Sequence, residues 1–320
     1  MKLSVIIPTY NRAGVLMRCL QALFAQRGVD ASWEIIVVDD GSTDNTADAV
    51  RGLTHESPVP LHYEHQPNRG PAAARNNGIR MANGRLVYMT DSDVLAAPNL
   101  LRHHLAAHDR HPAPAVGVLG LMRWAPALQV TPFMRWWEGV RFRFDRLLAG
   151  VEPINHTYFY TCNISVKRQF LMEHGLFDER FPAAAYEDTE LAYRLKEDGF
   201  RLVFAPDAVV YHDHPTDFAH ACRQMETIGR SAPLYRAQTG HSGLPRWWNW
   251  LSRTPLASRP VATLLSPIAE ALQARAVVPP IFVPVLVHHF VQGQKNYYPA
   301  IQPSSHPAIS FWEEESTQGE

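Results

Sequence analysis

Apolar and polar positions alternate along the first half of the chain in a β-α-β-α pattern. Apolar runs over 3–8 and 34–38 predict buried strands, and the second run is apolar on both faces, which is typical of a parallel strand covered by helices. Between them, apolar residues recur at helical spacing behind Asn11, which we assign as an N-cap. Further strands are expected over 61–65 and 86–90, and further helices over 44–51 and 70–81. This repetition predicts an α/β fold with a Rossmann-like, mostly parallel sheet and flanking helices.

The second half of the chain is less regular. We expect helices over 99–111, 132–148, 188–199 and 216–238, and strands over 116–122, 158–166, 201–205 and 209–211. Beyond Gly240 tryptophans and prolines become frequent, so we place a domain boundary there. The predicted organisation is one domain over 1–239, with halves 1–115 and 116–239, and a helical extension over 240–320. The tail from about residue 303 is expected to be disordered.

Three polar clusters follow the predicted strands at their carboxyl ends. The clusters are Pro8-Thr9-Tyr10-Asn11, Asp39-Asp40 and Asp91-Ser92-Asp93. Ligands of open parallel sheets bind at this edge, where the ends of neighbouring strands meet. The pattern therefore predicts one ligand site built from all three clusters.

The acidic clusters suit particular ligands. Asp91 and Asp93 are separated by one residue, and their oxygens suit Mg²⁺ or Mn²⁺, which would in turn hold a diphosphate. Taken alone, this pair is as consistent with a solvated loop. Asp39 ends an apolar strand, where a buried acid needs a partner such as a nucleobase or ribose, although it also fits a tight turn.

Three weaker signals lie outside the strand ends. Arg75 lies on a helix that follows Gly70 and is a candidate phosphate ligand, with a surface arginine as the alternative. Glu187 and Asp188 are candidates for a general base, and they also suit the first turn of a helix. His212 follows an apolar strand, where it could complete a metal site or begin a polar loop.

A further set of histidines lies at helical spacing. His104, His108 and His111 share one side of the expected helix over 99–111. No acid or cysteine completes a metal site beside them, so we interpret the set as a solvated face.

Composition excludes some classes of protein. The 320 residues include 30 Lys and Arg against 31 Asp and Glu, a net charge of −1, which argues against a nucleic-acid-coating protein. Three dispersed cysteines, Cys19, Cys162 and Cys222, are too few for a disulfide framework and favour a reducing, cytoplasmic compartment. The sequence also lacks a Gly-x-Gly-x-x-Gly, a Walker-type loop and a Gly-x-Ser-x-Gly elbow, which disfavours dehydrogenases, kinases with such loops and α/β-hydrolases.

Membrane association remains open at this stage. The start of the chain has no signal peptide pattern, and the apolar stretch over 276–291 is short and interrupted by prolines, so we expect no membrane span. Trp247, Trp248 and Trp250 and the stretch over 277–291 suit an amphipathic segment on a membrane surface. A packing arm or a homodimer contact explains them equally well. The predicted location is cytoplasmic, with the inner face of a membrane as the alternative.

Taken in order, these clusters closely resemble glycosyltransferase family 2, the inverting enzymes of the GT-A fold. The resemblance covers residues 1 to about 235 and rests on the strand-end motifs, Arg75-Asn76-Asn77-Gly78, Thr161 to Arg168, Phe177-Asp178-Glu179, Glu187-Asp188 and His212. Each motif is weak alone, but their order, spacing and placement agree. The GT-A resemblance implies that 1–115 binds a nucleotide sugar and that 116–239 binds the acceptor.

The resemblance also implies a role for individual residues. Asp188 would be the catalytic base, with Glu187 as its neighbour or substitute. A divalent Mn²⁺ or Mg²⁺ would be held by Asp93, Asp91 and His212. The acceptor would lie near Asn163 and Glu187. The implied donor-binding residues are Pro8, Thr9, Tyr10, Asn11, Asp39, Arg75, Asp91 and Ser92.

The activity implied by the family is the transfer of a single sugar from a nucleotide-diphosphate sugar to the hydroxyl of a saccharide, a lipid-linked acceptor or another glycoconjugate, with inversion. The Gln-x-x-Arg-Trp motif of the long processive members is absent. One alternative is a nucleotidyltransferase that makes sugar nucleotides, although the basic Gly-rich loop that it needs after the first strand is missing. The other is a degenerate, non-catalytic module that binds nucleotide sugars, against which the complete set of acids argues.

Overall fold

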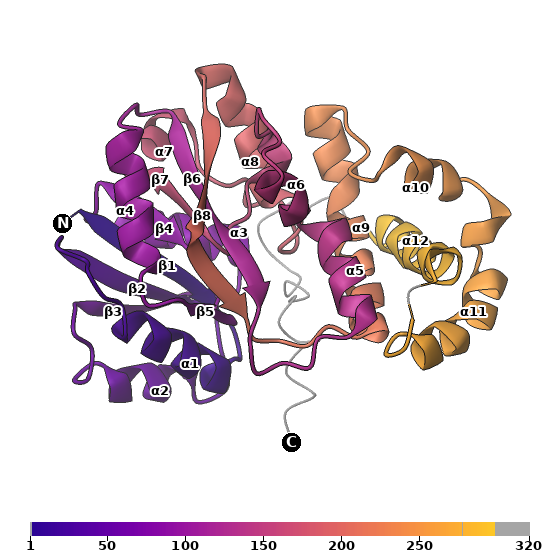
Figure 1. Cartoon of the computed structure of the whole chain (residues 1–320), viewed down its shortest axis with the longest axis horizontal. Coiled ribbons are helices and arrows are strands. Elements are labelled where there is room, and N and C mark those ends of the chain that lie inside the picture. Colours follow the sequence, from indigo (N-terminus) through magenta and orange to yellow (C-terminus); the bar gives the residue numbers. More distant parts are fainter. Residues whose placement is uncertain (1, 277, 298–320) are drawn as a thin grey trace.

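A computed structural model describes residues 2–276 and 278–297 of the chain, and Figure 1 shows their arrangement. The described residues contain one eight-stranded sheet in the order β3-β2-β1-β4-β7-β6-β8-β5. The strands are β1 (Leu3–Thr9), β2 (Trp33–Asp39), β3 (Leu61–His65), β4 (Leu86–Met89), β5 (Val94–Ala96), β6 (Val116–Trp124), β7 (Ile164–Lys167) and β8 (Arg201–His212).

Helices cover this sheet and continue beyond it. The helices are α1 (Ala13–Phe24), α2 (Thr46–Leu53), α3 (Pro71–Met81), α4 (Leu100–Arg110), α5 (Pro132–Arg141), α6 (Phe144–Leu148), α7 (Arg168–His174), α8 (Glu187–Leu195), α9 (Phe218–Thr239), α10 (Arg246–Leu251), α11 (Arg259–Leu272) and α12 (Pro279–Lys295). Helix α3 packs on β1 and β2, and α4 packs on β6 and β8. Among the described residues, no helix has the length and apolarity that crossing a membrane requires.

The sheet is parallel on its first side and mixed on the other. Strand β1 pairs in parallel with β2 and β4, and β2 pairs in parallel with β3. All seven residues of both β1 and β2 are buried, as expected for strands covered on two faces. Strand β7 then runs antiparallel to β4 and β6, and β5 runs antiparallel to β8. The parallel ends of β1, β2 and β4 therefore meet at one edge, as the sequence pattern predicts.

Several predicted elements differ from the observed ones. The strand expected over 158–166 is only the short β7, preceded by a 3₁₀ turn over 156–158. The helix expected over 132–148 is two helices, because Arg143 adopts a left-handed conformation with φ 52° between α5 and α6. The strands expected over 201–205 and 209–211 are one strand, β8, whose register on β6 shifts after Ala205. A local apolar pattern does not register such kinks and bulges, which depend on the neighbouring strand.

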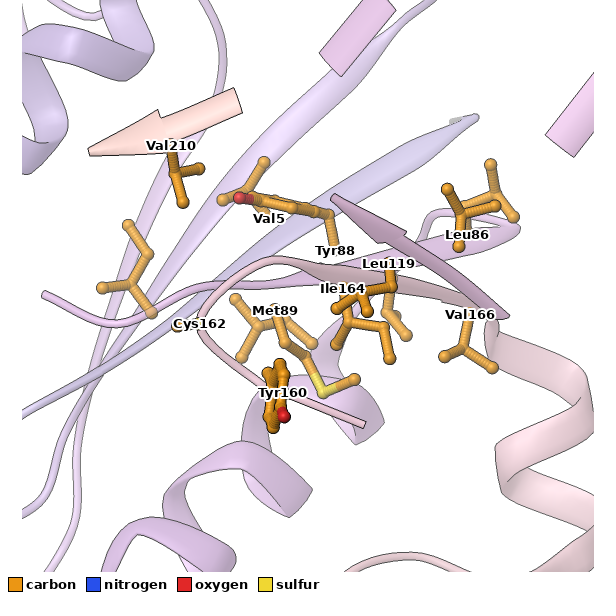
Figure 2. Packing of buried hydrophobic residues seen from close by; sticks show 14 of the residues in the cluster. Val5, Leu86, Tyr88, Met89, Leu119, Tyr160, Cys162, Ile164, Val166 and Val210 are labelled. Atoms are coloured by element: carbon orange, nitrogen blue, oxygen red, sulfur yellow. The ribbon is translucent and has the colours of Figure 1, made fainter. Parts of the chain in front are cut away.

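The core beneath the strand ends is closely packed. Figure 2 shows Tyr88 and Met89 of β4 beside Leu119 of β6 and Ile164 of β7, all fully buried. Met89 pairs with Ile164 across the antiparallel ladder of β4 and β7. Since the chain leaves β4 at Met89 and reaches Asp91 two residues later, the acidic turn starts from a rigid support.

The prediction of a solvated histidine face on α4 is wrong for His104 and His108, which are buried against the sheet. His104 Nδ1 lies 2.8 Å and His108 Nε2 lies 2.9 Å from Ser165 Oγ, and His104 Nε2 lies 2.9 Å from Asn163 Oδ1. Burial lowers the pKa of His104 to about 4 and that of His108 to about 3. Both rings are therefore neutral structural groups. His111 is the C-cap of α4 and is not part of this network.

The residues after Gly240 form helices α10, α11 and α12, which pack beside α9 (Figure 1). Helix α12 lies along α9, and the two backbones approach closely at Gly229 and Gly293, where a Cβ would collide with the facing helix. Phe133 of α5, Phe218 of α9 and Phe282 of α12 share one hydrophobic cluster. The stretch over 278–291 therefore packs against α9, as the packing-arm alternative predicts, and membrane contact of the region after Gly240 stays a prediction. Val277 and the tail from 303 lie outside the described residues.

Candidate functional site

The turns after β1 and β2 are joined by hydrogen bonds. The amide nitrogen of Asn11 donates to Ser42 Oγ over 2.7 Å, and Asn11 Oδ1 accepts from the amide nitrogen of Thr43 over 2.8 Å. Asn11 adopts a left-handed conformation with φ 49°, so it is not the N-cap of α1, a position that Arg12 takes. Two of the predicted clusters thus form one continuous wall.

Asp39 and Asp40 point to different partners. Asp39 accepts hydrogen bonds from the amide nitrogen of Ser42 over 2.8 Å and from the hydroxyl of Tyr63 over 2.5 Å. Asp40 accepts from Gln66 over 2.7 Å and from the amide nitrogen of Gly70 over 2.8 Å. Burial raises the pKa of Asp40 to about 6. Asp40, to which the sequence assigned no separate role, therefore holds the loop that leads into α3.

The end of β1 and the turn after β4 also contain polar groups that the protein leaves without partners. Thr9 and Ser92 are buried, and within residues 2–276 and 278–297 their hydroxyl groups have no hydrogen-bond partner. Pro8 and Tyr10 are buried next to Thr9. These residues occupy the end of β1 where the sequence predicts donor binding.

Arg75 is at the centre of the site and is almost completely buried, with 3% of its side chain exposed. Its Nη2 donates to Asp91 Oδ1 over 2.9 Å, and its Nη1 donates to Glu187 Oε1 over 2.8 Å. The guanidinium also lies 5.8 Å from the ring centroid of Phe177. Arg75 therefore links the turn after β4 to α8, and two carboxylates already compensate its charge.

Glu187 and Asp188 form the first turn of α8, which follows Tyr186 in a left-handed conformation. Burial and the charge of Asp188 raise the pKa of Glu187 to about 8. Burial also raises the pKa of Asp188, although Arg75 and a 2.6 Å hydrogen bond from the amide nitrogen of Thr189 oppose the shift. Asp188 is half-buried, so part of its surface is accessible to a ligand. A carboxylate with a raised pKa is a stronger base for a hydroxyl group.

Asp93 and His212 face each other across the turn after β4. Asp93 Oδ2 lies 3.7 Å from His212 Nε2 and 3.2 Å from Arg12 Nη1. Burial opposes ionisation of Asp93, but the charges of His212 and Arg12 outweigh it and lower the pKa of this carboxyl. Within the described part of the chain, no three His, Cys, Asp or Glu side chains form a complete metal site. Asp93 and His212 fit a divalent cation as two ligands of a set that a diphosphate would complete.

Asn163 lies in the core of the sheet. Its Nδ2 donates to the carbonyl oxygens of Leu121 over 3.1 Å and Ala208 over 2.9 Å, and its Oδ1 accepts from the hydroxyl of Tyr88 over 3.2 Å. The side chain is fully buried. Contact between Asn163 and an acceptor stays a prediction, and this geometry does not favour it.

Two residues of α5 that the sequence did not single out adjoin this site. Glu138 and Arg141 line a cavity of about 40 Å³ together with His212 and Trp124. The Trp124 ring stands edge-on to His212, with ring centroids 5.4 Å apart. The only local signal is the aromatic-rich helical pattern over 132–148, which does not indicate which side of the helix faces the site.

Comparisons with known sequences agree with the motif pattern. A family model described as Glycosyl transferase family 2 matches residues 4–175, more than half of the chain. Validoxylamine A glucosyltransferase of Streptomyces hygroscopicus subsp. jinggangensis (strain 5008) is 34% identical over 230 residues, covering 64% of this chain and 54% of that relative. Chondroitin synthase of Escherichia coli is 29% identical over 248 residues, covering 67% of this chain and 35% of that protein. The chain spans about half the length of the first of these relatives.

Solved structures share the fold. The mannosyltransferase PcManGT from Pyrobaculum calidifontis, in complex with GDP-Man and Mn²⁺, has a TM-score of 0.60 and 23% identity, covering 91% of this chain and 85% of its own. S. aureus TarS 1-349, in complex with UDP, has a TM-score of 0.53 and 18% identity, covering 92% and 91%. At these identities the likeness concerns the fold alone, which is of the GT-A type that the sequence motifs predict.

Proposed function

The chain belongs to glycosyltransferase family 2, and from this premise we propose that it transfers a single sugar from a nucleotide-diphosphate sugar to an acceptor hydroxyl with inversion. Family membership decides against the alternative of a nucleotidyltransferase. The donor class is supported by the fold relatives, whose structures contain GDP-Man, UDP or UDP-GlcNAc. The acceptor in this proposal is a saccharide, a lipid-linked sugar or another glycoconjugate.

The observation that carries the proposal is the raised pKa of Asp188 in a half-buried position at the start of α8. Its neighbour Glu187 is tied through Arg75 to Asp91, in the same turn as Asp93. One hydrogen-bond network therefore links the helix turn that carries the proposed base, Asp188, to the turn whose acids would hold a metal ion and its diphosphate. This combination fits a displacement in which a hydroxyl group attacks while a phosphate leaves.

In the proposed reaction, Asp188 accepts the proton of the acceptor hydroxyl as the oxygen attacks the anomeric carbon. The bond between that carbon and the diphosphate oxygen breaks, and a single displacement inverts the configuration. Asp93 and His212 would hold Mn²⁺ or Mg²⁺, which stabilises the negative charge of the diphosphate when bound. Glu187, held by Arg75, precedes Asp188 in the first turn of α8 and is its neighbour or substitute as the base.

On the donor side, the proposal uses the wall formed by the ends of β1 and β2. Tyr10 and Asp39 would contact the base, and Asp91 would contact the ribose or the metal ion. The unpartnered hydroxyls of Thr9 and Ser92 provide further hydrogen-bonding groups for the donor. Arg75 acts in this proposal through Asp91, because its Nη1 and Nη2 are already engaged by two carboxylates.

The test is a transfer assay with UDP-, GDP- and dTDP-sugars and Mn²⁺ over a panel of acceptors, followed by NMR of the anomeric product. We expect Asp188→Asn to reduce transfer about 1,000-fold or more while donor binding is retained, since general base catalysis and charge are both lost. Glu197→Gln, an exposed carboxylate at the end of α8, is the matched control. Transfer by Asp188→Asn near the wild-type rate would exclude Asp188 as the base, and nucleotide binding without any turnover would favour the non-catalytic alternative.

A further inference from the structure

Arg141, the last residue of α5, lines a cavity of about 40 Å³ together with His212, one of the proposed metal ligands. Burial lowers the pKa of Arg141, and the nearby charges of Tyr186, Asp188 and Glu187 oppose that shift. A cation that is half-buried and close to the acids of α8 therefore faces the same space as His212.

Arg141 differs from the other arginines of the cleft in its partners. Arg75 is paired with Asp91 and Glu187, and Arg12 is paired with Asp93. Over residues 2–276 and 278–297, the guanidinium of Arg141 has no hydrogen bond or ion pair, and it only approaches the ring of Phe142 at 5.9 Å. A half-buried guanidinium loses part of its hydration, so it favours an anionic ligand.

We propose that Arg141 is an oxyanion-binding residue of the cleft and donates its planar fork to a phosphate or carboxylate oxygen of a substrate. The anion would come either from the diphosphate of the donor or from an acidic acceptor. The cavity that Arg141 shares with His212 suits the first source, and the charge of Asp188, which acts on Arg141, suits the second. This inference rests on the proposed sugar transfer, because it names a ligand of the same cleft.

Calorimetry with UDP and GDP, each with Mn²⁺ and each compared with UMP and GMP, tests the diphosphate source. We expect Arg141→Met to weaken diphosphate binding about tenfold or more, equivalent to about 1.4 kcal/mol, and to change monophosphate binding much less. Arg135→Met, an exposed arginine on the same helix, is the matched control. Arg141→Gln serves as the second variant if Arg141→Met melts at a lower temperature than wild type.

Saturation-transfer NMR with glucuronate, glucose 6-phosphate and glucose tests the acceptor source. Loss of the two acidic sugars in Arg141→Met, with diphosphate binding unchanged, would assign Arg141 to the acceptor. Unchanged binding of every anion in a folded variant overturns the inference. All of these readouts are binding measurements, so a protein that binds anions through Arg141 but transfers no sugar would contradict the proposed function and leave this inference intact.

A separate observation concerns the exposed apolar side chains of α10, α11 and the turn between them. Helix α10 buries Trp248 and Leu251, while its Trp247 and Trp250 are 55% and 63% exposed. On α11, Leu264 is 69% exposed and Ile268, one turn later, is 43% exposed. With the half-exposed Leu256, this segment holds five of the eight exposed large apolar side chains of the described residues. We call these five residues the outer apolar surface.

The charged residues of the segment over 240–297 are mostly basic. Between residues 240 and 297 the sequence contains five basic residues and one acidic residue, Glu270, whereas the whole chain has a net charge of −1. The basic residues are Arg246, Arg253, Arg259, Arg275 and Lys295. All five are exposed. Tryptophan beside arginine is the combination that lies at the interface of an anionic lipid bilayer, with the ring among the headgroups and the cation on lipid phosphate.

We infer that the outer apolar surface docks on a bilayer that contains anionic lipids. The full chain is floated with vesicles of phosphatidylcholine alone and with vesicles that also contain phosphatidylglycerol. We expect binding to the anionic vesicles only, weakened by 0.5 M salt and reduced about tenfold by Trp247→Ala with Trp250→Ala. Met172→Ala, which removes an exposed apolar side chain on α7, is the matched control.

Charge reversal provides a second variant in case the tryptophan pair affects folding. Arg253→Glu with Arg259→Glu changes two exposed positions and should abolish flotation without altering the melting temperature. Absence of flotation by the wild-type chain overturns the inference. A dimer in light scattering that the tryptophan substitutions dissociate, with no lipid binding, also overturns it and assigns the surface to a second copy of the chain.

Discussion

The two sides of the cleft differ in how the protein treats buried charge. At the ends of β1 and β2, Asp39 and Asp40 accept hydrogen bonds from neighbouring backbone and side-chain donors. On the side of α8 and α5, the buried Glu187 and the half-buried Asp188 both have raised pKa values, and Arg141 has no hydrogen bond or ion pair among the described residues. The first side is organised before any ligand binds, whereas the second retains charge that a ligand or a reaction can use.

Arg75 connects the two sides. It contacts Asp91 in the turn after β4 and also Glu187 on α8, which lies 112 positions after Arg75 in the sequence. The comparison between the sides therefore depends on this one side chain. Substitution of Arg75 should therefore have a larger effect than substitutions on either side alone.

The largest expected effect comes from Arg75→Met. It leaves the buried carboxylates of Asp91 and Glu187 without their cation, so we expect the free energy of unfolding to fall by about 3–5 kcal/mol and transfer to be lost. Urea unfolding measures the first effect and the transfer assay the second. Arg80→Met, on the exposed side of α3, should change the stability by less than about 1 kcal/mol. Equal stability of the two variants would show that Arg75 does not hold the two sides together.

A second prediction concerns the metal ion. We expect Asp93→Asn to reduce transfer about 100-fold and to remove the stimulation by Mn²⁺, because one of the two proposed protein ligands is weakened. Wild-type enzyme in excess EDTA should show a similar loss. Asp109→Asn, at an exposed position on α4, is the control. Full activity of the wild type in EDTA would rule out the metal assignment.

Two buried groups, Glu187 and His104, should change the free energy of unfolding in opposite directions as pH rises. The folded pKa of Glu187 is raised to about 8 from 4.5, so the folded state binds more protons between these values and stability falls as pH rises. The folded pKa of His104 is lowered to about 4 from 6.5, so stability falls as pH decreases through that range. Each group changes the free energy of unfolding by at most about 1.4 kcal/mol per pH unit.

Melting temperatures recorded from pH 4 to pH 9 test this pair of slopes. Glu187→Gln should flatten the alkaline side of the profile, and His108→Gln, in the same network as His104, should reduce the acidic side. His103→Gln, on the exposed side of α4, serves as the control. A profile that neither substitution changes would contradict the assignment of both buried groups.

The smallest effect is expected at the strand-end side. Tyr63→Phe removes the hydroxyl that donates to Asp39 and should lower the stability by about 1 kcal/mol and weaken nucleotide binding a few-fold. Tyr211→Phe on β8 lies outside this network and should leave nucleotide binding unchanged. Tighter nucleotide binding by Tyr63→Phe would contradict this prediction and would show that the hydrogen bond from Tyr63 competes with the ligand for Asp39.

The local pattern of apolar residues was sufficient to predict the strands β1 and β2 and the acidic residues at their ends. The apolar runs of β1 and β2 were predicted nearly to the residue, because a strand buried on both faces leaves a continuous apolar signal. The acids that end these strands therefore lie where the sequence places them. Family membership, also legible from these motifs, agrees with the match over residues 4–175.

The buried side of α4 could not be predicted from the local pattern. The spacing of His104 and His108 established that they share one side of a helix, but not whether that side faces water or the sheet. The structure places them against Ser165, about 60 residues away in sequence. A polar side chain can be buried when a distant partner satisfies it, and no local rule reveals that partner.

The sequence by itself thus determined the α/β repetition, the acidic strand ends and the family. Only the tertiary structure decided that Arg75 joins Asp91 to Glu187, that Arg141 faces the cleft, and that α12 packs along α9. The physical reason is that strand and helix periodicity is encoded in neighbouring residues. Charge compensation, burial and close helix contacts depend instead on which distant residues the fold brings together.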